Sequence, residues 1–421
     1  MKVLISAYAC SPYQGSEPGV GWGFVAALAE RHDLWVIVEE EKFRSDIERY
    51  LAENPDFPSS VRFHFLRKQR NRPLRKLWPP SYYWYYRRWH ENCLVLAEEL
   101  HREVNFDLAH QLTMVGFREP GYLWKLGIPF VWGPIGGMGS FPWRFLPMAG
   151  AYGALYYVGY NLYNYLETRF ARRPRLAANF TGSGLLAATP ENQLGAKKYW
   201  GCPSTLICEV GLPPGSAVEP TRRAFGEPLR MVWTGLHIPR KALNLVLMAV
   251  ARLSGVLNWE LHVLGDGPCT AKWRRLAERL GVLDRCQFHG WLPRDQALGV
   301  MATSHLMLIT SLRDLTSTVT VEALALGLPI VCLDHCGFAG VVDDRCGIKV
   351  PVTTPAKVVT DLSLAIGRLA SDESLRVALA HGAVRRAQDF SWERKAELVD
   401  EIYRRKIEEH GGGRHEGPPG T

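Results

Sequence analysis

The sequence predicts an α/β protein built from two Rossmann-like domains, each a doubly wound parallel sheet. Short continuous apolar runs such as LRMVWTG alternate with amphipathic segments such as KALNLVLMAVARLSG, a rhythm typical of parallel strands that helices cover on both faces. The length of 421 residues exceeds what one ordinary core accommodates, so two domains are expected. Ligands of such sheets bind at the carboxyl ends of strands, so the loops after strands are where a site is expected.

The strand and helix rhythm occurs twice, on either side of the Pro- and Gly-rich segment LPPGSAVEPTRRAFGEP, which indicates an interdomain linker. We expect a first domain over residues 1–212 and a second over 213–389. A last helix is expected over 390–410. The tail, residues 411–421, is rich in Gly and Pro and is expected to be disordered.

The composition indicates which classes of binding partner to expect but does not identify one. A net charge of +8 favours an anionic partner: a nucleotide, a phospholipid surface or a nucleic acid. The nine cysteines include no C-x-x-C pair, which favours reduced thiols and a cytoplasmic location. The N-terminus lacks the pattern of a secretory signal, and no run reaches the roughly 18 to 20 apolar residues needed to span a bilayer.

Two glycine-containing loops follow predicted strands. In CSPYQGSEPGVGWGF, Gly15, Gly19 and Gly21 precede a helix, where backbone amides could approach an anion; a tight turn with close packing explains them equally well. In HVLGDGP, Gly265 and Asp266 end a strand and would either line a ligand or simply form a capped turn.

A basic pair follows another strand, in WTGLHIPRKALNLVL. Pro239 suits a first helical turn, which would place Arg240 and Lys241 at the positive end of a helix. Cations there are unfavourable by roughly 0.3–1 kcal/mol unless an anion compensates. A diphosphate would compensate; two solvated basic residues are the alternative.

The segment TSLRDLTSTVTVEALALGLP joins a buried strand to a helix expected at about residues 317–326. Glu322 has no Lys or Arg three or four residues away and no capping partner, so it is expected to be an unpaired carboxylate that a hydroxyl-rich ligand such as a ribose would satisfy. Asp314 by itself is an ordinary turn residue. The amides of Thr316, Ser317 and Thr318 open the helix and could hold a phosphate.

These loops together resemble the retaining glycosyltransferases of family 4, which have the GT-B fold of two Rossmann-like domains. The resemblance covers nearly the whole chain. Its most specific part is an acidic pair separated by seven residues and followed by Ala and a Gly-x-Pro strand entry, here Asp314, Glu322, Ala323, Gly327 and Pro329. Asp stands where the family has a first Glu, which shortens the reach of that carboxylate.

The resemblance implies a role for each matching position. Glu322 would accept the ribose hydroxyls, and Asp314 would contact hydroxyls of the transferred sugar. The amides at 316–318 would hold the diphosphate with Lys241. Because the family's usual Arg after WTG is Leu236 here, the phosphates would depend more on Lys241, with help from Arg240.

The first domain contributes further matches. His110, in DLAHQL, matches a His near the transferred sugar and is the candidate catalytic residue beside Asp314; a structural histidine is the alternative. Gly19 and Gly21 match a Gly-rich loop facing the diphosphate, and Gly265 and Asp266 match a turn in the donor domain. The segment FSW at 390–392 resembles one that crosses back onto the first domain.

No D-x-D occurs in the chain, so we expect no metal and no cofactor other than the nucleotide-diphosphate sugar itself. Positive side chains and a helix N-terminus would then stabilise the leaving group.

Two segments of the first domain, which in this fold binds the acceptor, have a distinctive composition. Residues 67–90 contain eight Lys or Arg, no Asp or Glu and seven Trp or Tyr, and residues 143–174 are again rich in aromatics. Basic and interfacial aromatic residues suit peripheral contact with an anionic membrane; packed aromatic helices beside a solvated loop are the alternative. Nucleic acid is disfavoured because no RNA- or DNA-binding module is recognisable.

The sequence therefore predicts a retaining, metal-independent glycosyltransferase of the hexosyl type, acting in polysaccharide or glycolipid biosynthesis at the cytoplasmic face of a membrane. Its expected partners are a nucleotide-sugar donor and a glycan or lipid-linked acceptor. Two alternatives stay open: a sugar-nucleotide or glycan-binding GT-B protein without turnover, suggested by Asp314 and Leu236, and a GT-B nucleotide-sugar epimerase. Donor base, sugar, acceptor, linkage and oligomeric state are not encoded in these motifs.

Overall fold

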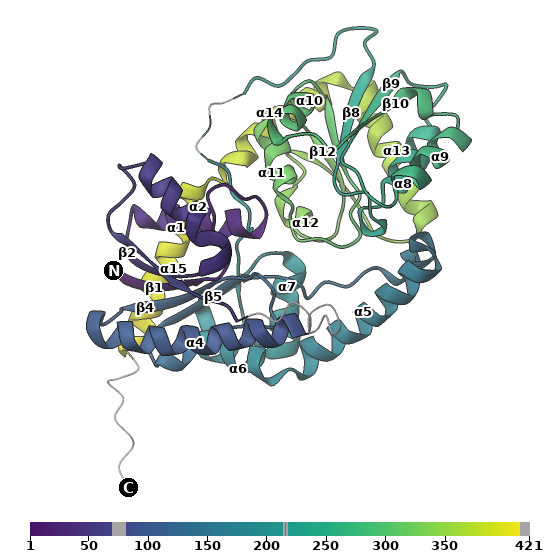
Figure 1. Ribbon diagram of the computed structural model, residues 1–421. Coiled ribbons are helices and arrows are strands. Elements are labelled where there is room, and N and C mark those ends of the chain that lie inside the picture. The colour runs from purple at the N-terminus through teal and green to yellow at the C-terminus, as the bar shows by residue number, and fades with distance from the viewer. Residues whose placement is uncertain (70–80, 214, 216–217, 413–421) are drawn as a thin grey trace.

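The computed structural model describes residues 1–421 except 70–80, 214, 216–217 and 413–421. The described residues form two α/β domains that face each other, with the first domain coloured purple to teal and the second green to yellow in Figure 1. The expected two-domain α/β architecture is confirmed. The expected disorder of the tail is wrong for residues 411 and 412, which belong to the last helix; residues 413–421 lie outside the described ones.

The first domain is built on a parallel sheet of order β3-β2-β1-β4-β5-β6-β7 among the described residues. Its strands are β1 (Lys2–Ala7), β2 (Asp33–Glu39), β3 (Val61–Leu66), β4 (Leu108–Thr113), β5 (Phe130–Ile135), β6 (Leu185–Ala187) and β7 (Thr205–Leu206). Its helices are α1 (Glu17–Ala29), α2 (Glu40–Glu53), α4 (Ser81–Val104), α5 (Gly150–Phe170), α6 (Arg172–Thr181) and α7 (Pro190–Gly195). Central strands such as β4 are buried along their whole length, as expected of a sheet covered on both faces.

The second domain repeats the plan with sheet order β10-β9-β8-β11-β12-β13. Its strands are β8 (Leu229–Thr234), β9 (Trp259–Leu264), β10 (Cys286–Gly290), β11 (Leu306–Ile309), β12 (Ile330–Leu333) and β13 (Gly347–Val350). Its helices are α8 (Leu243–Ala251), α9 (Thr270–Arg279), α10 (Arg294–Ala302), α11 (Thr318–Ala325), α12 (Phe338–Val341), α13 (Pro355–Ser371) and α14 (Glu373–Gln388).

The strand order of the second sheet reverses between β8 and β11, which pair in parallel. The crevice outside the carboxyl ends of strands at such a reversal is where open α/β sheets bind ligands. The loops after β8 and β11 carry the basic pair and the acidic motif of the sequence. The topology therefore brings these two predicted segments to one place.

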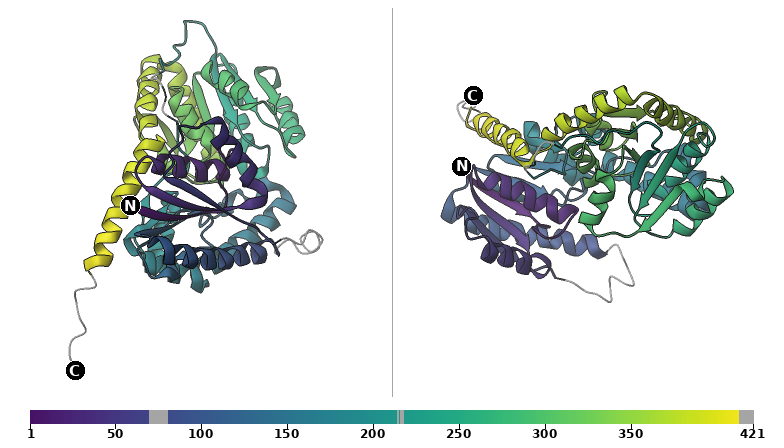
Figure 2. Two further views of the ribbon diagram at one scale, coloured as in Figure 1. Left: turned by 60° about the vertical axis from the view of Figure 1, so that its left-hand side comes forward. Right: turned by 90° about the horizontal axis from the view of Figure 1, so that it is seen from above.

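The chain crosses between the domains twice, and the two crossings pair with each other. The Leu212 amide donates to the Phe390 carbonyl (3.0 Å) and the Trp392 amide donates to the Leu212 carbonyl (3.0 Å). The last helix, α15 (Trp392–Gly412), then packs on α1 of the first domain, along which the yellow helix runs in Figure 2. A Cβ on Gly23 or Gly211 would lie 2.2 or 2.6 Å from the Trp392 ring, so this docking requires glycine at both positions.

Among the described residues no helix has the length and apolar character needed to cross a membrane. The nine cysteines are all unpaired.

Candidate active site between the two domains

A triad of opposite charges occupies the loops after β8 and β11. Lys241 Nζ lies 2.5 Å from Asp314 Oδ2, and Arg240 Nη1 lies 3.2 Å from Asp314 Oδ1. Burial by itself would raise the pKa of Asp314, but the charges of Lys241 and Arg240 outweigh burial and hold it below its ordinary value. The carboxylate therefore stays ionised, and the site has two cations for one anion.

The local path of the basic pair differs from the prediction. Pro239–Lys241 forms a short 3-10 turn, and α8 begins only at Leu243 after Ala242 adopts a left-handed conformation with φ 49°. The expectation that Arg240 and Lys241 open the long helix is therefore wrong. Instead the turn directs both side chains across to Asp314.

The segment that leads into α11 already binds a carboxyl group of the protein itself, that of Glu209. The Thr316 amide donates to Glu209 Oε1 (2.8 Å), and the Thr316 hydroxyl donates to Glu209 Oε2 (3.0 Å). Glu209 follows the last strand of the first domain and is 3% exposed; burial raises its pKa although the contacts with Thr316 oppose the shift. Of the three amides predicted to hold a phosphate, this leaves those of Ser317 and Thr318.

Glu322 is not the unpaired carboxylate that the sequence suggested. Its Oε1 accepts from Arg294 Nε (2.9 Å) and Arg294 Nη2 (2.7 Å). Arg294 is the first residue of α10 and precedes Glu322 by 28 positions. It therefore cannot be found among the residues three or four positions from Glu322, where helical ion pairs form. Its side chain is 65% exposed against 10% for Glu322, so the arginine can withdraw and leave the carboxylate oxygen to a ligand hydroxyl.

His110 is not brought into this group. Its side chain is fully buried, Nδ1 lies 2.6 Å from the Tyr403 hydroxyl of α15, and Nε2 lies 2.8 Å from the Gly133 carbonyl. Burial lowers its pKa to about 4, so the imidazole is neutral at physiological pH. With both nitrogens engaged in the core, the geometry supports the structural alternative rather than the catalytic role.

The expectation that Gly19 and Gly21 precede a helix is wrong, because both lie inside α1 (Glu17–Ala29), where they serve close packing. A Cβ on Gly21 would lie 2.1 Å from the Ala9 carbonyl oxygen, and one on Gly19 would lie 2.7 Å from that of Gln14, while Gly15 has open space around it. Next to them, Glu17 accepts a short hydrogen bond from the Val115 amide.

The turn after β9 is held by its own side chain. Gly265 has φ 109°, and a Cβ there would lie 2.1 Å from the Gly235 carbonyl oxygen. Asp266 accepts from the Gly267 amide (2.8 Å) and the Thr270 hydroxyl (2.5 Å), which lower its pKa. The capped-turn explanation of Asp266 accounts for these contacts.

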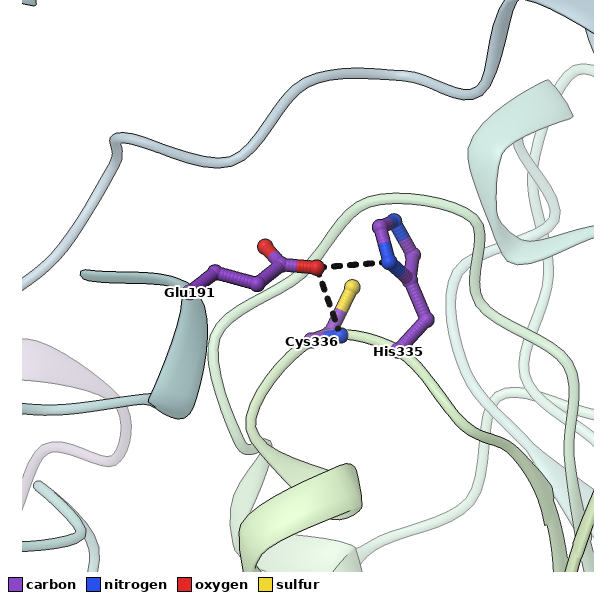
Figure 3. Close-up of side chains that lie close together, drawn as sticks. All are labelled: Glu191, His335 and Cys336. Carbon is purple, nitrogen blue, oxygen red and sulfur yellow. Dashed lines mark hydrogen bonds and ion pairs between the residues drawn. The ribbon is translucent and has the colours of Figure 1, made fainter. Parts of the chain in front are cut away.

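A cavity of about 290 Å³ lies between the domains and includes Asp314 and Arg240 in its wall. The first domain contributes the loop after β5 and the start of α7, and the second domain contributes the loops after β11 and β12. At its wall Glu191 of α7 meets the loop after β12: Glu191 Oε1 lies 2.5 Å from His335 Nδ1 and accepts from the Cys336 amide at 3.1 Å (Figure 3). These three residues are also the described group with the donor types to hold a metal ion.

Glu191, His335, Cys336 and Glu209 were missed from the sequence. His335 and Cys336 follow the buried strand β12 after Asp334, so the expectation that loops after strands carry the site applies to them too. No sequence pattern pointed to Glu191 or Glu209, because the residues that they contact belong to the other domain.

The Glu191–His335 pair should make stability depend on pH. Burial disfavours the imidazolium, but Glu191 outweighs burial and raises the pKa of His335 above its ordinary 6.5; burial likewise opposes ionisation of Glu191, yet His335 lowers its pKa below 4.5. The histidine's contribution is full below pH 6.5 and is lost as pH rises through its folded pKa. The glutamate's contribution is present above pH 4.5 and is lost as pH falls through its folded pKa.

Glu191→Gln is therefore expected to lower Tm most between pH 4.5 and 6.5, by an amount equivalent to about 2 kcal/mol, and progressively less toward pH 9. Thermal unfolding of both proteins in a chelator across this range measures the difference. Glu278→Gln, on the exposed face of α9, is the matched control. A wild-type–variant difference that stays constant with pH would contradict the ion pair.

Comparison with known proteins agrees with this architecture. Residues 228–372 match the family described as glycosyl transferases group 1. D-inositol 3-phosphate glycosyltransferase of Corynebacterium jeikeium is 29% identical over 204 residues, which are 45% of this chain and 48% of that protein. The chain thus spans about half the length of the curated relatives it matches.

Solved structures extend the likeness to both domains. HepE of Anabaena in complex with UDP has a TM-score of 0.61 at 16% identity and covers 96% of this chain and 100% of its own. Sucrose-phosphate synthase of Thermosynechococcus elongatus has a TM-score of 0.59 at 16% identity, covering 97% and 99%. The two facing sheets with a crossing C-terminal helix show that this chain has the GT-B fold. Its second domain is similar to the glycosyl transferases group 1 family over residues 228–372.

Proposed function

We propose that this protein is a retaining glycosyltransferase that moves a sugar from a nucleotide-diphosphate sugar to a hydroxyl acceptor in polysaccharide or glycolipid biosynthesis. The observation that carries the proposal is the meeting of Lys241, Arg240 and Asp314 in the loops after β8 and β11, where Arg240 and Asp314 line a cavity between the two domains. The matched family and the names of the relatives support a glycosyl transfer. HepE, solved with UDP, supports a nucleotide in the cleft.

Each group has a task in this proposal. The diphosphate would be bound by Lys241 and Arg240 together with the Ser317 and Thr318 amides, whose position at a helix N-terminus favours an anion. These fixed positive groups would also stabilise the charge that develops on the leaving nucleoside diphosphate. We therefore propose that turnover needs no metal ion at the diphosphate.

The two carboxylates would contact neutral hydroxyls. Glu322 would accept hydrogen bonds from the ribose once Arg294 swings into solvent. Asp314, held ionised by Lys241 and Arg240, would accept from hydroxyls of the transferred sugar. The retaining outcome follows from the resemblance of the acidic motif to family 4 enzymes. Proton transfer by His110 is not part of the proposal, because both of its ring nitrogens are engaged in the core.

A donor screen tests the binding half of the proposal. Thermal shift against UDP-, GDP-, ADP- and dTDP-sugars should show one base raising Tm clearly more than the others, because specificity lies in contacts outside the diphosphate. The shift should persist in a chelator. No shift with any of the four classes would contradict a nucleotide-sugar site.

We further propose that the acceptor is lipid-linked and that the protein contacts an anionic membrane through α5 and α6. Figure 1 places α4 and α6 below the first sheet and shows α5 leading from there toward the second domain. Along α5 these large apolar side chains are more than half exposed: Tyr152, Leu155, Tyr156, Leu162, Tyr163, Leu166 and Phe170. The buried residues of the helix, Tyr157, Asn161, Asn164 and Thr168, recur every three or four positions and form its inner face. An apolar outer face of this kind is typical of interfacial helices.

A basic hollow adjoins this face. Arg169, Arg172, Arg175 and Lys198 line it together with Phe170, and acidic side chains are absent from its described lining. Apolar insertion combined with basic attraction is the two-signal arrangement that gives stable membrane attachment. The sequence also pointed to the basic segment at 67–90, of which residues 70–80 lie outside the described part. Farther along this segment, Arg87 Nε lies 3.6 Å from Glu119 Oε2 and the Arg88 guanidinium lies over the Trp84 ring.

The triple variant Arg169→Gln, Arg172→Gln, Arg175→Gln should bind anionic vesicles about 100-fold more weakly, since each basic residue near such a surface contributes about 1 kcal/mol. Co-sedimentation with phosphatidylcholine vesicles with and without phosphatidylglycerol measures this. Lys272→Gln, Arg275→Gln, Arg279→Gln on α9 removes the same charge elsewhere and should bind like the wild type. An equal loss of vesicle binding in both triple variants would show that only the net charge of the protein matters. Unchanged binding in both would contradict the proposed membrane-contacting surface.

A further inference from the structure

Three side chains of different chemistry converge where the two domains meet. The Glu191 carboxylate, the His335 imidazole and the Cys336 thiol place their ligand atoms within 4.8 Å of one another, and Figure 3 shows all three directed toward a common point. Glu191 comes from α7 of the first domain, and the other two from the loop after β12. We propose that they form a binding site for a divalent transition-metal ion of the zinc class, which would bridge the domains.

The groups around the three ligands support this assignment. His335 Nε2 lies 3.0 Å from the Leu312 carbonyl; since a carbonyl can only accept, Nε2 carries a proton, and Nδ1 is the nitrogen turned toward Glu191. A histidine that binds a metal through one nitrogen usually donates its other N–H to a carbonyl or carboxylate in this way. The Asp314 amide donates to Cys336 Sγ at 3.1 Å; burial and the carboxylates of Glu191 and Asp314 nevertheless raise the pKa of this thiol, so the metal ion has to displace its proton.

The donor set selects the class of metal. One imidazole nitrogen, one sulfur and one carboxylate oxygen suit Zn²⁺ or Co²⁺, whereas Mg²⁺ and Ca²⁺ prefer oxygen ligands alone. The ion would replace the proton now shared between Nδ1 and Oε1 and the proton of the thiol, so binding releases protons. Three protein ligands beside an open cavity leave a fourth position for water or another ligand.

This site differs from a metal that bridges a donor diphosphate. It contains no Asp pair, and its ligands are separate from Lys241 and Glu322, which the proposed donor site uses. The ion would tie the first domain to the second through Glu191, in the cavity that Asp314 also lines. Metal binding can therefore be measured whether or not the protein transfers a sugar.

Co²⁺ is the probe that reports the ligands directly. The full chain, stripped with a chelator and dialysed, is expected to bind one equivalent of Co²⁺ with a thiolate-to-cobalt charge-transfer band in the near ultraviolet and visible bands typical of four-coordinate cobalt. Cys336→Ser should abolish the charge-transfer band. Glu191→Gln should keep the band but weaken Co²⁺ binding at least tenfold, because it removes one of three ligands.

Cys269→Ser, a half-buried cysteine of the second domain, is the matched control and should bind Co²⁺ like the wild type. Because Cys336 is buried, Tm and circular dichroism in chelator establish that the serine variant is folded; if it is not, His335→Gln takes its place and should also lose binding. The absence of a charge-transfer band in the wild type, or a band that persists in Cys336→Ser, would overturn the site.

Discussion

Replacing Lys241 by alanine is expected to lower kcat/KM for the nucleotide-sugar donor about 10²- to 10³-fold, the usual cost of removing one charge-stabilising donor from an active site. Lys241 is the cation closest to Asp314, 2.5 Å away, and its side chain is 11% exposed. A lysine so placed meets a diphosphate with little competition from water. The larger part of the loss should fall on kcat, because negative charge develops as the leaving group departs. Steady-state release of nucleoside diphosphate measures both constants.

Two further variants make this prediction specific. Lys357→Ala removes a surface lysine that pairs with Asp361 on α13 and should leave both constants unchanged. Asp314→Ala should also reduce turnover, and the double variant with Lys241→Ala should lose less than the sum of the two, because the side chains are coupled. Additive losses, or normal turnover in Lys241→Ala, would contradict a shared role in the donor site.

Glu322→Gln is expected to weaken binding of the nucleotide about 10- to 100-fold, because hydrogen bonds to an ionised partner contribute about 1.5–3 kcal/mol. The ribose hydroxyls are bound equally in the ground state and the transition state, so KM should rise while kcat changes little. The fold should tolerate the change, since the Arg294 partner is 65% exposed and exposed pairs contribute little to stability. Calorimetric titration with the preferred nucleoside diphosphate measures the affinity.

Arg294 provides an internal control for Glu322. If the arginine only covers the carboxylate until a ribose arrives, Arg294→Gln should bind the nucleotide as tightly as the wild type or slightly more tightly. Glu278→Gln, an exposed glutamate of α9, should leave affinity unchanged. A loss in Arg294→Gln as large as that in Glu322→Gln would instead show that the ion pair itself supports the site.

Periodicity and loop position predicted much of this molecule. Alternating apolar strands and amphipathic helices follow from local backbone preferences and burial, which sequence patterns record directly. The resemblance to family 4 placed Asp314 and Lys241 in one site although they are 73 positions apart, and the carboxyl ends of parallel strands, which meet at one edge, account for their meeting.

The pairings that the sequence did not predict are tertiary. Arg294 reaches Glu322 from a neighbouring helix, and Glu209 reaches Thr316 from the other domain. The two residues of each pair are too far apart in the sequence to be detected from the period of a helix or of a strand. The expected position of His110 at the end of a strand is wrong: it lies inside β4 (Leu108–Thr113), paired with Ile5 and Val131 of the neighbouring strands, and its Nδ1 contacts the Tyr403 hydroxyl of the returning helix.

The central claim is that the interdomain site transfers a sugar from a nucleotide donor to an acceptor. The most direct measurement follows nucleoside diphosphate release together with a labelled sugar, in a chelator, with and without a crude lipid acceptor, for wild type and Lys241→Ala. We predict release that depends on the acceptor, label entering the lipid or glycan fraction, and loss of both in the variant. Donor binding without release for any nucleotide sugar, or conversion of the donor without an acceptor, would contradict the claim.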